Sequence, residues 1–552
     1  MKNRLSKLLI FLVVFLAFLL RLYKVTQDPP ALNWDETSIG YNAYSILKTG
    51  RDEWGQFMPV HFRSYGEYKL PAQIYASIPA IAIIGLNELG VRITPVVYGA
   101  LTVLFLFFLA RKISKNYWVG LISAFLLAIS PWHLQLTRAN FESSFSVFWV
   151  VLGVWLFVKG FEDKKFWVWS TLPFIISIYT YNAARVFTPL FLIALFLIYR
   201  KDILKNTKVV IFSILVFLLS MIPLVGFILG GEATARFNLV SITDDPGFIL
   251  RINETRGNTH LPVPLPRLIH NKVTHYVYVF VGNYLSHFSP NFLFISGAGH
   301  RQQHVQGIGE LYVIQAPFIL IGLYFLFRNK IKWRWLLITW LLLAFIPVSA
   351  TVDSTPNALR TLLAAIPYQI ITALGFYEVF TILKHKPVPR WVMVAVSAVA
   401  LTVSVKGYLN NYYNIYPKLY SRDWQYGYKQ VVSYIKTHYD NYDLIVFSRT
   451  YGEPHMFTLF WLGWDPGRYQ NDPNLDRFEA NQWVWVLKFD KFYFPDLGDA
   501  GSHYQDIVNI NSGKKILFIG KTGDFPDSVP RLLTVDFLNG SRAFDIVEKY
   551  AQ

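Results

Sequence analysis

Two adjacent carboxylates near the N-terminus are the first candidates for chemistry. Asp35 and Glu36 stand in the segment ALNWDETSIGYNAYSILKTG, whose apolar positions recur with the spacing of an amphipathic helix. A carboxylate at a helix N-terminus can act as a general base and take a proton from a hydroxyl group. The same residues also fit a structural role, because Asn33 is a good N-cap and Glu36 completes a capping box three residues later. Both interpretations are open from the residues alone.

A lysine and a glutamate precede the next apolar segment. Glu67 and Lys69 stand in GEYKLPAQIY, directly before the apolar residues 71–86. A lysine at this place is typical of the end of a membrane segment, where it anchors the chain at the interface. It can equally hold a phosphate group as a point charge.

Three isolated arginines stand next to apolar runs. Arg138 lies in PWHLQLTRANFESS, Arg185 in YTYNAARVFTP and Arg360 in DSTPNALRTLLAAIP. Each of them alone fits an ordinary interface residue, and Glu142 can pair with Arg138 on one helix face. Together they favour an anionic ligand, because the guanidinium fork binds two phosphate oxygens at once.

Three histidines raise the question of a metal site. His287, His300 and His304 fall in one loop, and the last two are four residues apart. Neighbouring glycines weaken the prediction of a shared helix face, and no HExxH pattern is present. Packing or hydrogen-bonding roles are favoured. A divalent metal stays possible as a cofactor, but no metal ligand is assigned.

The composition indicates a membrane protein. Of the 552 residues, 53% are hydrophobic and 16% are charged, against about a quarter charged in soluble domains. The net charge of +17 does not indicate a nucleic-acid partner, because the Lys and Arg residues form short clusters between apolar runs. The chain has no cysteine, which excludes disulfides, thiolate metal sites and cysteine nucleophiles.

About eleven apolar segments are long enough to cross a bilayer. The predicted spans are 6–24, 91–111, 117–131, 143–159, 166–180, 186–200, 208–230, 311–328, 333–350, 361–383 and 391–409. We interpret the first as a retained span in which Arg21 and Lys24 snorkel to the interface from a tilted helix end. Residues 71–86 contain two prolines and are predicted to be re-entrant or interfacial.

The basic residues predict the orientation. With the N-terminus in the cytoplasm, the clusters of Lys and Arg fall on the inner loops, as the positive-inside rule requires. This places residues 25–90, 231–310 and 410–552 outside the cytoplasm, in a multi-pass protein of the plasma membrane. Residues 443–448 and 514–521 read as buried strands and 430–439 as a helix. We therefore expect a membrane domain over 1–409 and an extracytoplasmic α/β domain over 410–552.

The order of these motifs resembles a known family. The chain is similar to the bacterial polyprenyl-phosphate-dependent glycosyltransferases of the GT-C fold, which are related to protein O-mannosyltransferases and to the lipid A aminoarabinose transferase. The resemblance rests on motifs spread over about residues 5–410: Trp34-Asp35-Glu36, Lys69-Leu70-Pro71, Gly85-Leu86-Asn87-Glu88 with Arg92, Arg138 with Phe141 and Glu142, Tyr181 with Arg185 and Pro189, and Arg360 with Pro367.

This resemblance implies an activity and a set of site residues. It implies sugar transfer from a polyprenyl-phosphate donor to a hydroxyl of a protein, lipid or envelope glycan at the outer face of the membrane. Asp35 would be the catalytic base, with Glu36 the less favoured choice, and Lys69 would bind the lipid phosphate. The remaining candidates for substrate binding are Glu67, Arg138, Glu142, Tyr181, Arg185, His300, Arg301 and Arg360. In the aminoarabinose enzyme a metal-binding glutamate directly precedes the lysine; here Tyr68 intervenes, so that role is not carried over.

Two other classes of protein compete with this interpretation. A transporter would place charged residues near the middle of the membrane or break helices in matched halves. Here the charges gather at the ends of the apolar segments. A non-catalytic membrane protein that binds glycans or lipids would have no need of Asp35.

Overall fold

The computed structural model describes residues 2–231, 240–244, 247–262, 264–353, 355–480, 483–498 and 501–550. The chain forms two compact units, which are described separately. The first consists of Met1–Arg21, Val96–Thr137 and Glu142–Leu409. The second consists of Leu22–Pro95, Arg138–Phe141 and Asn410–Gln552, so distant parts of the sequence meet in it.

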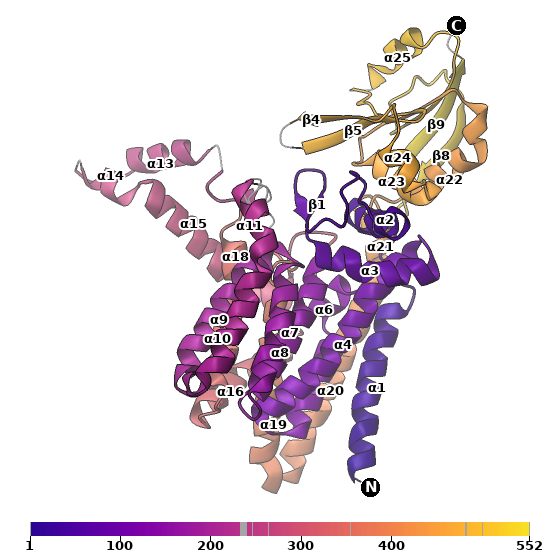
Figure 1. The fold of residues 1–552 in the computed structure, drawn as a ribbon. Coiled ribbons are helices and arrows are strands. Elements are labelled where there is room, and N and C mark those ends of the chain that lie inside the picture. The colour runs from indigo at the N-terminus through magenta and orange to yellow at the C-terminus, as the bar shows by residue number, and fades with distance from the viewer. Residues whose placement is uncertain are drawn as a thin grey trace. The chain divides into compact units, whose positions relative to one another are not determined.

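The first unit is helical (Figure 1). Its first half contains α1 (Lys2–Leu22), most of α4 (Glu88–Ser114), α5 (Tyr117–Ala128), α6 (Pro131–Leu136), α7 (Glu142–Lys159), α8 (Lys165–Ile178), α9 (Asn182–Ile203), α10 (Thr207–Ser220) and α11 (Ile222–Leu229). Its second half contains α13 (Phe248–Gly257), α14 (Leu265–Ile269), α15 (Lys272–Ser286), α16 (Gln315–Arg328), α17 (Arg334–Leu343), α18 (Ile346–Ser349), α19 (Ala365–Ile382) and α20 (Pro387–Asn410).

Each predicted span coincides with one of these helices or with a consecutive pair of them. Within the described residues, six helical segments are long and apolar enough to cross a membrane. Shorter apolar helices cover the other predicted spans, and α3 (Pro71–Ile84) covers the segment that we expected to be re-entrant or interfacial. A helical, multi-pass membrane protein is therefore confirmed.

Small residues let helices of the first unit approach closely. Gly322 of α16 and Gly375 of α19 face one another's backbones, and a Cβ atom on Gly375 would lie 1.9 Å from the carbonyl oxygen of Phe318. Such contacts between small residues are common where helices pack in membranes.

Arg21 near the end of α1 has no exposed surface. Its Nε donates to Thr137 Oγ1 over 2.8 Å, and its Nη2 lies 2.7 Å from His133 Nδ1. The prediction that Arg21 snorkels to the interface is therefore wrong, because the guanidinium finds its partners inside the protein.

The second unit joins a loop region to a mixed sheet. It contains α2 (Trp34–Thr49), the hairpin of β1 (Phe62–Arg63) and β2 (Tyr68–Lys69), α3, α21 (Tyr416–Tyr420), α22 (Tyr428–His438), α23 (Pro454–Leu462), α24 (Pro466–Gln470) and α25 (Tyr504–Ile510). The sheet has the strand order β4-β5-β6-β3-β7-β9-β8. Its strands are β3 (Leu444–Phe447), β4 (Asp476–Ala480), β5 (Trp483–Phe489), β6 (Phe492–Tyr493), β7 (Lys515–Gly520), β8 (Arg531–Asp536) and β9 (Arg542–Tyr550).

Parallel and antiparallel pairs both occur in this sheet. The central strand β3 runs parallel to β6 and β7, and the other pairs are antiparallel. The predicted strands at 443–448 and 514–521 and the helix at 430–439 are confirmed as β3, β7 and α22.

One hydrophobic core joins α2 to the C-terminal sheet. Ile39 and Ala43 of α2 lie buried in the same cluster as Met456 and Phe460 of α23. Gly40 of α2 fits this contact, because a Cβ atom there would lie 2.7 Å from the Phe460 ring. Residues 22–95 therefore pack against residues 410–552 in one core, and this close packing fixes the position of α2.

Candidate active site

The N-terminal turn of α2 carries both candidate carboxylates. Asn33 caps the helix: its side chain accepts a hydrogen bond of 2.9 Å from the Glu36 backbone N–H. The Glu36 carboxylate accepts in return from the Asn33 backbone N–H over 3.3 Å, so the predicted capping box is confirmed. Successive residues on a helix point about 100° apart, so Asp35 and Glu36 face different surroundings.

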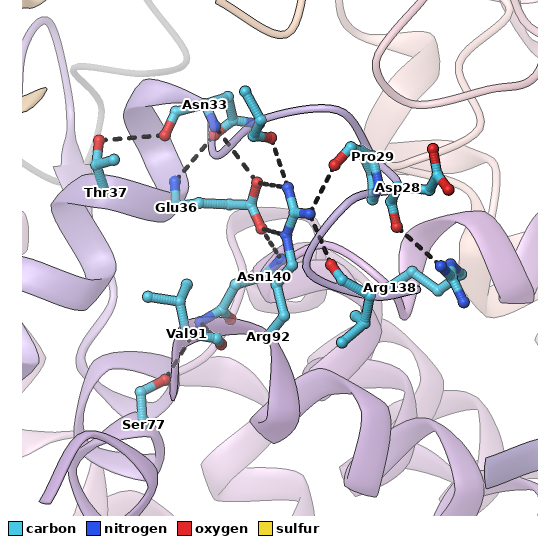
Figure 2. A network of polar contacts seen from close by, with 12 residues as sticks. Asp28, Pro29, Asn33, Glu36, Thr37, Ser77, Val91, Arg92, Arg138 and Asn140 are labelled. Carbon is cyan, nitrogen blue, oxygen red and sulfur yellow. Dashed lines mark hydrogen bonds and ion pairs between the residues drawn. The ribbon is translucent and has the colours of Figure 1, made fainter. Parts of the chain in front are cut away.

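Glu36 faces the interior of the unit (Figure 2). Its two oxygens accept hydrogen bonds of 2.9 Å each from Nε and Nη2 of Arg92. The backbone N–H of Asn140 adds a third bond over 3.0 Å. Glu36 and Arg92 both have no exposed surface. The hydrogen-bonding capacity of Glu36 is thus used within the protein, which favours a structural role for it.

Arg92 also holds the loop that leads into α2. Its remaining N–H groups donate to the carbonyl oxygens of Val25 and Pro29 over 2.9 and 2.8 Å, and to that of Ala31 over 2.5 Å. Arg92 is not among the residues predicted for the site. Its position near the start of α4 was visible in the sequence, but its partners lie 56 or more residues away.

Arg138 serves the same loop from another side. Its Nη2 donates to the carbonyl oxygens of Tyr23 and Asp28 over 2.7 and 2.8 Å, and its Nε donates to the Tyr412 hydroxyl over 3.0 Å. The guanidinium has no exposed surface and lies over the rings of Tyr412 and Tyr413. Arg138, which we predicted to bind phosphate, thus donates these hydrogen bonds to groups of the protein itself (Figure 2).

Asp35 meets Lys69. The Lys69 Nζ lies 2.5 Å from Asp35 Oδ1, and the side chains are 3% and 31% exposed. The β1–β2 hairpin places the lysine, because Lys69 pairs with Phe62 across it. Two residues predicted to carry chemistry, 34 positions apart, therefore meet at one point. The carboxylate keeps a solvent-facing side that a hydroxyl group can approach.

Trp34, directly before Asp35, is fixed on several sides. Its backbone N–H donates to Gln425 Oε1 over 2.9 Å, and its carbonyl oxygen accepts from the Tyr65 hydroxyl over 2.9 Å. Gly452, with a φ of +119°, leaves room for the indole, since a Cβ atom there would lie 2.5 Å from the ring. These contacts hold the backbone beside Asp35 in place.

Two further carboxyl groups lie buried near this point. Burial raises the pKa of Glu53 to about 7, although Asn42 donates it a hydrogen bond of 3.1 Å. Burial also raises the pKa of Glu453 to about 8, and the negative charges of Glu53 and Asp35 act in the same direction. Neither residue was predicted for the site, because no motif in the sequence marks Glu53 or Glu453.

Glu67 lies in the turn between β1 and β2, where its carbonyl oxygen accepts a hydrogen bond of 2.8 Å from the Ser64 N–H. The remaining predicted site residues belong to the first unit. Arg360 makes a bidentate ion pair with Asp353: Nη1 lies 2.5 Å from Oδ1 and Nη2 lies 2.6 Å from Oδ2. Arg185 Nη1 lies 3.3 Å from Asn182 Oδ1, and its guanidinium lies over Phe227. Glu142 begins α7 and Tyr181 caps α9.

The histidine loop also belongs to the first unit. His304 Nδ1 lies 2.9 Å from the buried Glu310 carboxylate. Burial opposes the charged imidazole, but Glu310 together with backbone hydrogen bonds to Ile308 and Ser296 raises the pKa of His304. His300 is partly buried and Arg301 is exposed in the same loop. Among the described residues, no group of three or more His, Asp or Glu side chains is arranged to hold a metal ion.

Residues 74–227 match the family described as dolichyl-phosphate-mannose-protein mannosyltransferase. This segment contains α4 to α10 and the candidates Arg138, Glu142, Tyr181 and Arg185; Asp35, Glu36, Glu67 and Lys69 precede it. Comparison by sequence with curated proteins finds no match.

Solved structures share the fold over the whole chain. ArnT from Cupriavidus metallidurans in the apo state is 11% identical, with a TM-score of 0.55, and the match covers 100% of this chain and 99% of ArnT. The same protein bound to undecaprenyl phosphate gives 12% identity and a TM-score of 0.54, over 99% and 98% of the two chains.

A second fold relative is longer than this chain. The oligosaccharyltransferase AglB from Archaeoglobus fulgidus, in complex with an inhibitory peptide and a dolichol-phosphate, is 14% identical with a TM-score of 0.51. The match covers 84% of this chain and spans 64% of the length of AglB. The predicted architecture, a helical membrane protein with a C-terminal mixed sheet, is confirmed by the ArnT fold.

Proposed function

We propose that this chain, a membrane glycosyltransferase of the GT-C fold with a mannosyltransferase-family segment at residues 74–227, moves a sugar from a polyprenyl phosphate to an acceptor hydroxyl. The observation that carries the proposal is the contact of 2.5 Å between Asp35 and Lys69. This contact joins the partly exposed carboxylate in the first turn of α2 to a lysine at the end of β2. The reaction needs a carboxylate as base and a cation beside the leaving phosphate.

The reaction asks for two functions from these residues. A free oxygen of Asp35 takes the proton of the acceptor hydroxyl. The hydroxyl oxygen then bonds to the anomeric carbon while the bond from that carbon to the phosphate oxygen breaks. The polyprenyl phosphate leaves with the electron pair and the negative charge. A nearby cation stabilises the charge that develops on the leaving oxygen.

Lys69 can contact both Asp35 and the phosphate. An ammonium group has three N–H donors, so Lys69 can hold the Asp35 carboxylate and also act as a point charge toward a phosphate group. In this role Lys69 holds the base and the leaving group at a short distance from each other, which is the positioning that the reaction requires. The ArnT relative was solved with undecaprenyl phosphate and the AglB relative with a dolichol-phosphate, which supports a donor of this class.

Asp35 is a better candidate for the base than Glu36. Glu36 is fully buried and accepts hydrogen bonds from Arg92, Asn140 and Asn33. A substrate hydroxyl could reach it only if that network opened. Asp35 is 31% exposed and its bond to Lys69 engages one oxygen. In this proposal Glu36, Arg92 and Arg138 position the loop before α2.

The proposal also specifies on which side of the membrane the active site lies. The clusters of Lys and Arg in the sequence favour an N-terminus in the cytoplasm and a site at the outer face of the plasma membrane. The acceptor is a hydroxyl group of a glycan, lipid or protein in the cell envelope.

The test uses the purified full chain in lipid nanodiscs. It is incubated with synthetic polyprenyl phosphates that carry different single sugars, together with envelope extract as a source of acceptors, and the release of polyprenyl phosphate is measured. We expect release from at least one donor, dependent on extract and lost in Asp35→Asn, while the exposed control Asp536→Asn stays active. Absence of cleavage with every donor, together with movement of the intact lipid across the membrane when the chain is placed in closed liposomes, would contradict the proposal and indicate a transporter.

A further inference from the structure

Three aromatic side chains gather beside the candidate base. Tyr65 and Trp483 stack with ring centroids 5.8 Å apart and an interplanar angle of 13°. Trp34 lies against both, at 6.1 Å from Tyr65 and 6.2 Å from Trp483. Tyr65 is almost fully buried, whereas both tryptophans are partly exposed. We call Trp34, Tyr65 and Trp483 the aromatic face.

This aromatic face is tied to Asp35 through the backbone. Trp34 is the residue before Asp35, and the Tyr65 hydroxyl donates to its carbonyl oxygen over 2.9 Å. Tyr65 stands in the turn between β1 and β2, four residues before Lys69. A molecule that lies on the exposed tryptophans is therefore close to the carboxylate that would take its proton.

Glu453 fixes the orientation of Trp483. The indole Nε1–H donates to Glu453 Oε1 over 2.6 Å, and Glu453 has no exposed surface. The second oxygen, Oε2, is buried without a hydrogen bond and lies 3.4 Å from His455 Nδ1. Burial raises the pKa of this carboxyl group to about 8, so at neutral pH it holds a proton and Trp483 is anchored to an uncharged group.

We propose that the aromatic face binds a sugar ring of the acceptor, so that the acceptor is a glycan or the sugar head group of a glycolipid. This inference rests on the function proposed above and names the acceptor that Asp35 would deprotonate. A sugar ring has one face of C–H groups, which packs on aromatic rings, and a rim of hydroxyls, which need polar partners. The partly exposed tryptophans supply the aromatic surface for the C–H face, and the Asp35 carboxylate supplies a polar partner for a hydroxyl.

The backbone around the aromatic face does not favour a peptide. An extended peptide binds best along an open strand edge, where main-chain groups are unpaired. Here β5, which carries Trp483, is paired with β4 along one edge. Along its other edge, the Val484 N–H donates to the Tyr65 carbonyl oxygen over 2.8 Å.

The first test measures binding without any donor. Saturation-transfer NMR is recorded for the full chain in nanodiscs with an equimolar panel of methyl glycosides and, separately, with a Ser/Thr-rich peptide. We expect transfer to the C–H protons of at least one glycoside, loss of that signal in Trp483→Ala, and retention in Trp461→Ala. Trp461 is a partly exposed tryptophan of α23 outside the aromatic face and serves as the matched control.

The role of Glu453 as a positioning residue has its own readout. Glu453→Gln keeps an oxygen that can accept from the Trp483 indole, so glycoside binding should stay within about twofold of the parent. Glu453→Leu removes the acceptor and should weaken binding about tenfold, the size of one lost aromatic contact. Equal weakening by both variants would contradict this role.

The outcomes separate this inference from the proposed function. Binding of the peptide but of no glycoside, or binding that Trp483→Ala leaves unchanged, would overturn the inference. Cleavage of a polyprenyl-phosphate donor with that peptide as acceptor would leave the proposed function intact. Glycoside binding at Trp483 without cleavage of any donor would support the sugar subsite and refute the proposed function.

Discussion

The Glu36 carboxylate and the Arg92 guanidinium form two hydrogen bonds of 2.9 Å, and neither side chain has exposed surface. Glu36 completes the capping box of α2 with Asn33, and Arg92 donates hydrogen bonds to the carbonyl groups of the loop before this helix. This pair therefore sets the position of the turn that carries Asp35.

Breaking this pair should destabilise the protein. Glu36→Ala leaves the Arg92 charge buried without its partner, which costs about 3–5 kcal/mol. The change should appear as a marked fall in melting temperature of the purified protein. Arg63 and Glu479 form the matched control, an ion pair of 3.0 Å whose side chains are 37% and 60% exposed. Arg63→Ala should cost at most about 1 kcal/mol. Equal shifts for both variants would contradict a structural role for the buried pair.

Much of the architecture could be predicted from local sequence. Long apolar runs predicted the helices of the first unit, because hydrophobic length depends on neighbouring residues alone. The capping box at Asn33 and Glu36 and the strands β3 and β7 have equally local signals. The pattern of motifs also indicated the fold that the ArnT comparison confirms.

The partners of the charged side chains could not be predicted in this way. Arg138 and Arg360 both suit a phosphate by residue type, yet each makes hydrogen bonds to groups of the protein. Glu453 and Trp483 approach Asp35 only because residues 410–552 fold onto α2. Contacts over such sequence distances follow from tertiary packing, which no local pattern records. Whether each predicted residue acts on a substrate stays a prediction.

Glu453 should make stability depend on pH. Its pKa is about 8 in the folded protein against an ordinary value of 4.5. The folded state therefore binds more protons between these values, and stability falls as the pH rises from about 4.5 to about 8. The Glu453→Gln side chain stays neutral at every pH. The difference in melting temperature between this variant and the parent should therefore shift in favour of the variant as the pH rises from 5 to 9. The gain should exceed about 1.4 kcal/mol, the value of one pKa unit. If the melting temperatures of variant and parent change equally with pH across this range, Glu453 is not a buried group that titrates.

Lys69 should matter for the lipid donor more than for folding. Lys69→Met removes the ammonium group and keeps most of the aliphatic chain. Loss of one charge-assisted hydrogen bond costs about 1.5–3 kcal/mol, so the KM for the polyprenyl-phosphate donor should rise about 10–100-fold. Lys429→Met is the control, because Lys429 is 53% exposed and pairs with Glu88. An unchanged donor KM in Lys69→Met would exclude Lys69 as a phosphate contact.

The orientation can be tested with reporter fusions. Green fluorescent protein exported in unfolded form does not mature outside the cytoplasm, so a fusion after Gln552 should stay dark. A fusion to a chain truncated after Lys330, in a loop predicted to be cytoplasmic, should fluoresce. A bright signal after Gln552 would mean that the number of spans is wrong by one.

The central claim is that Asp35 is the general base, and Asp35→Asn tests it most directly. Asparagine is about as good as aspartate near a helix N-terminus, and its amide oxygen can still accept a hydrogen bond from Lys69, so the variant should fold with only a modest fall in melting temperature from the lost charge pair. The amide cannot take the proton of the acceptor, and general-base catalysis is worth about 10²–10⁴-fold in rate. The measurement is sugar transfer from a polyprenyl-phosphate donor by the purified variant and the parent, with both melting curves recorded. We predict a rate loss of that order in a variant that stays folded and melts only modestly below the parent. Activity within about twofold of the parent would contradict the assignment of Asp35 as the base.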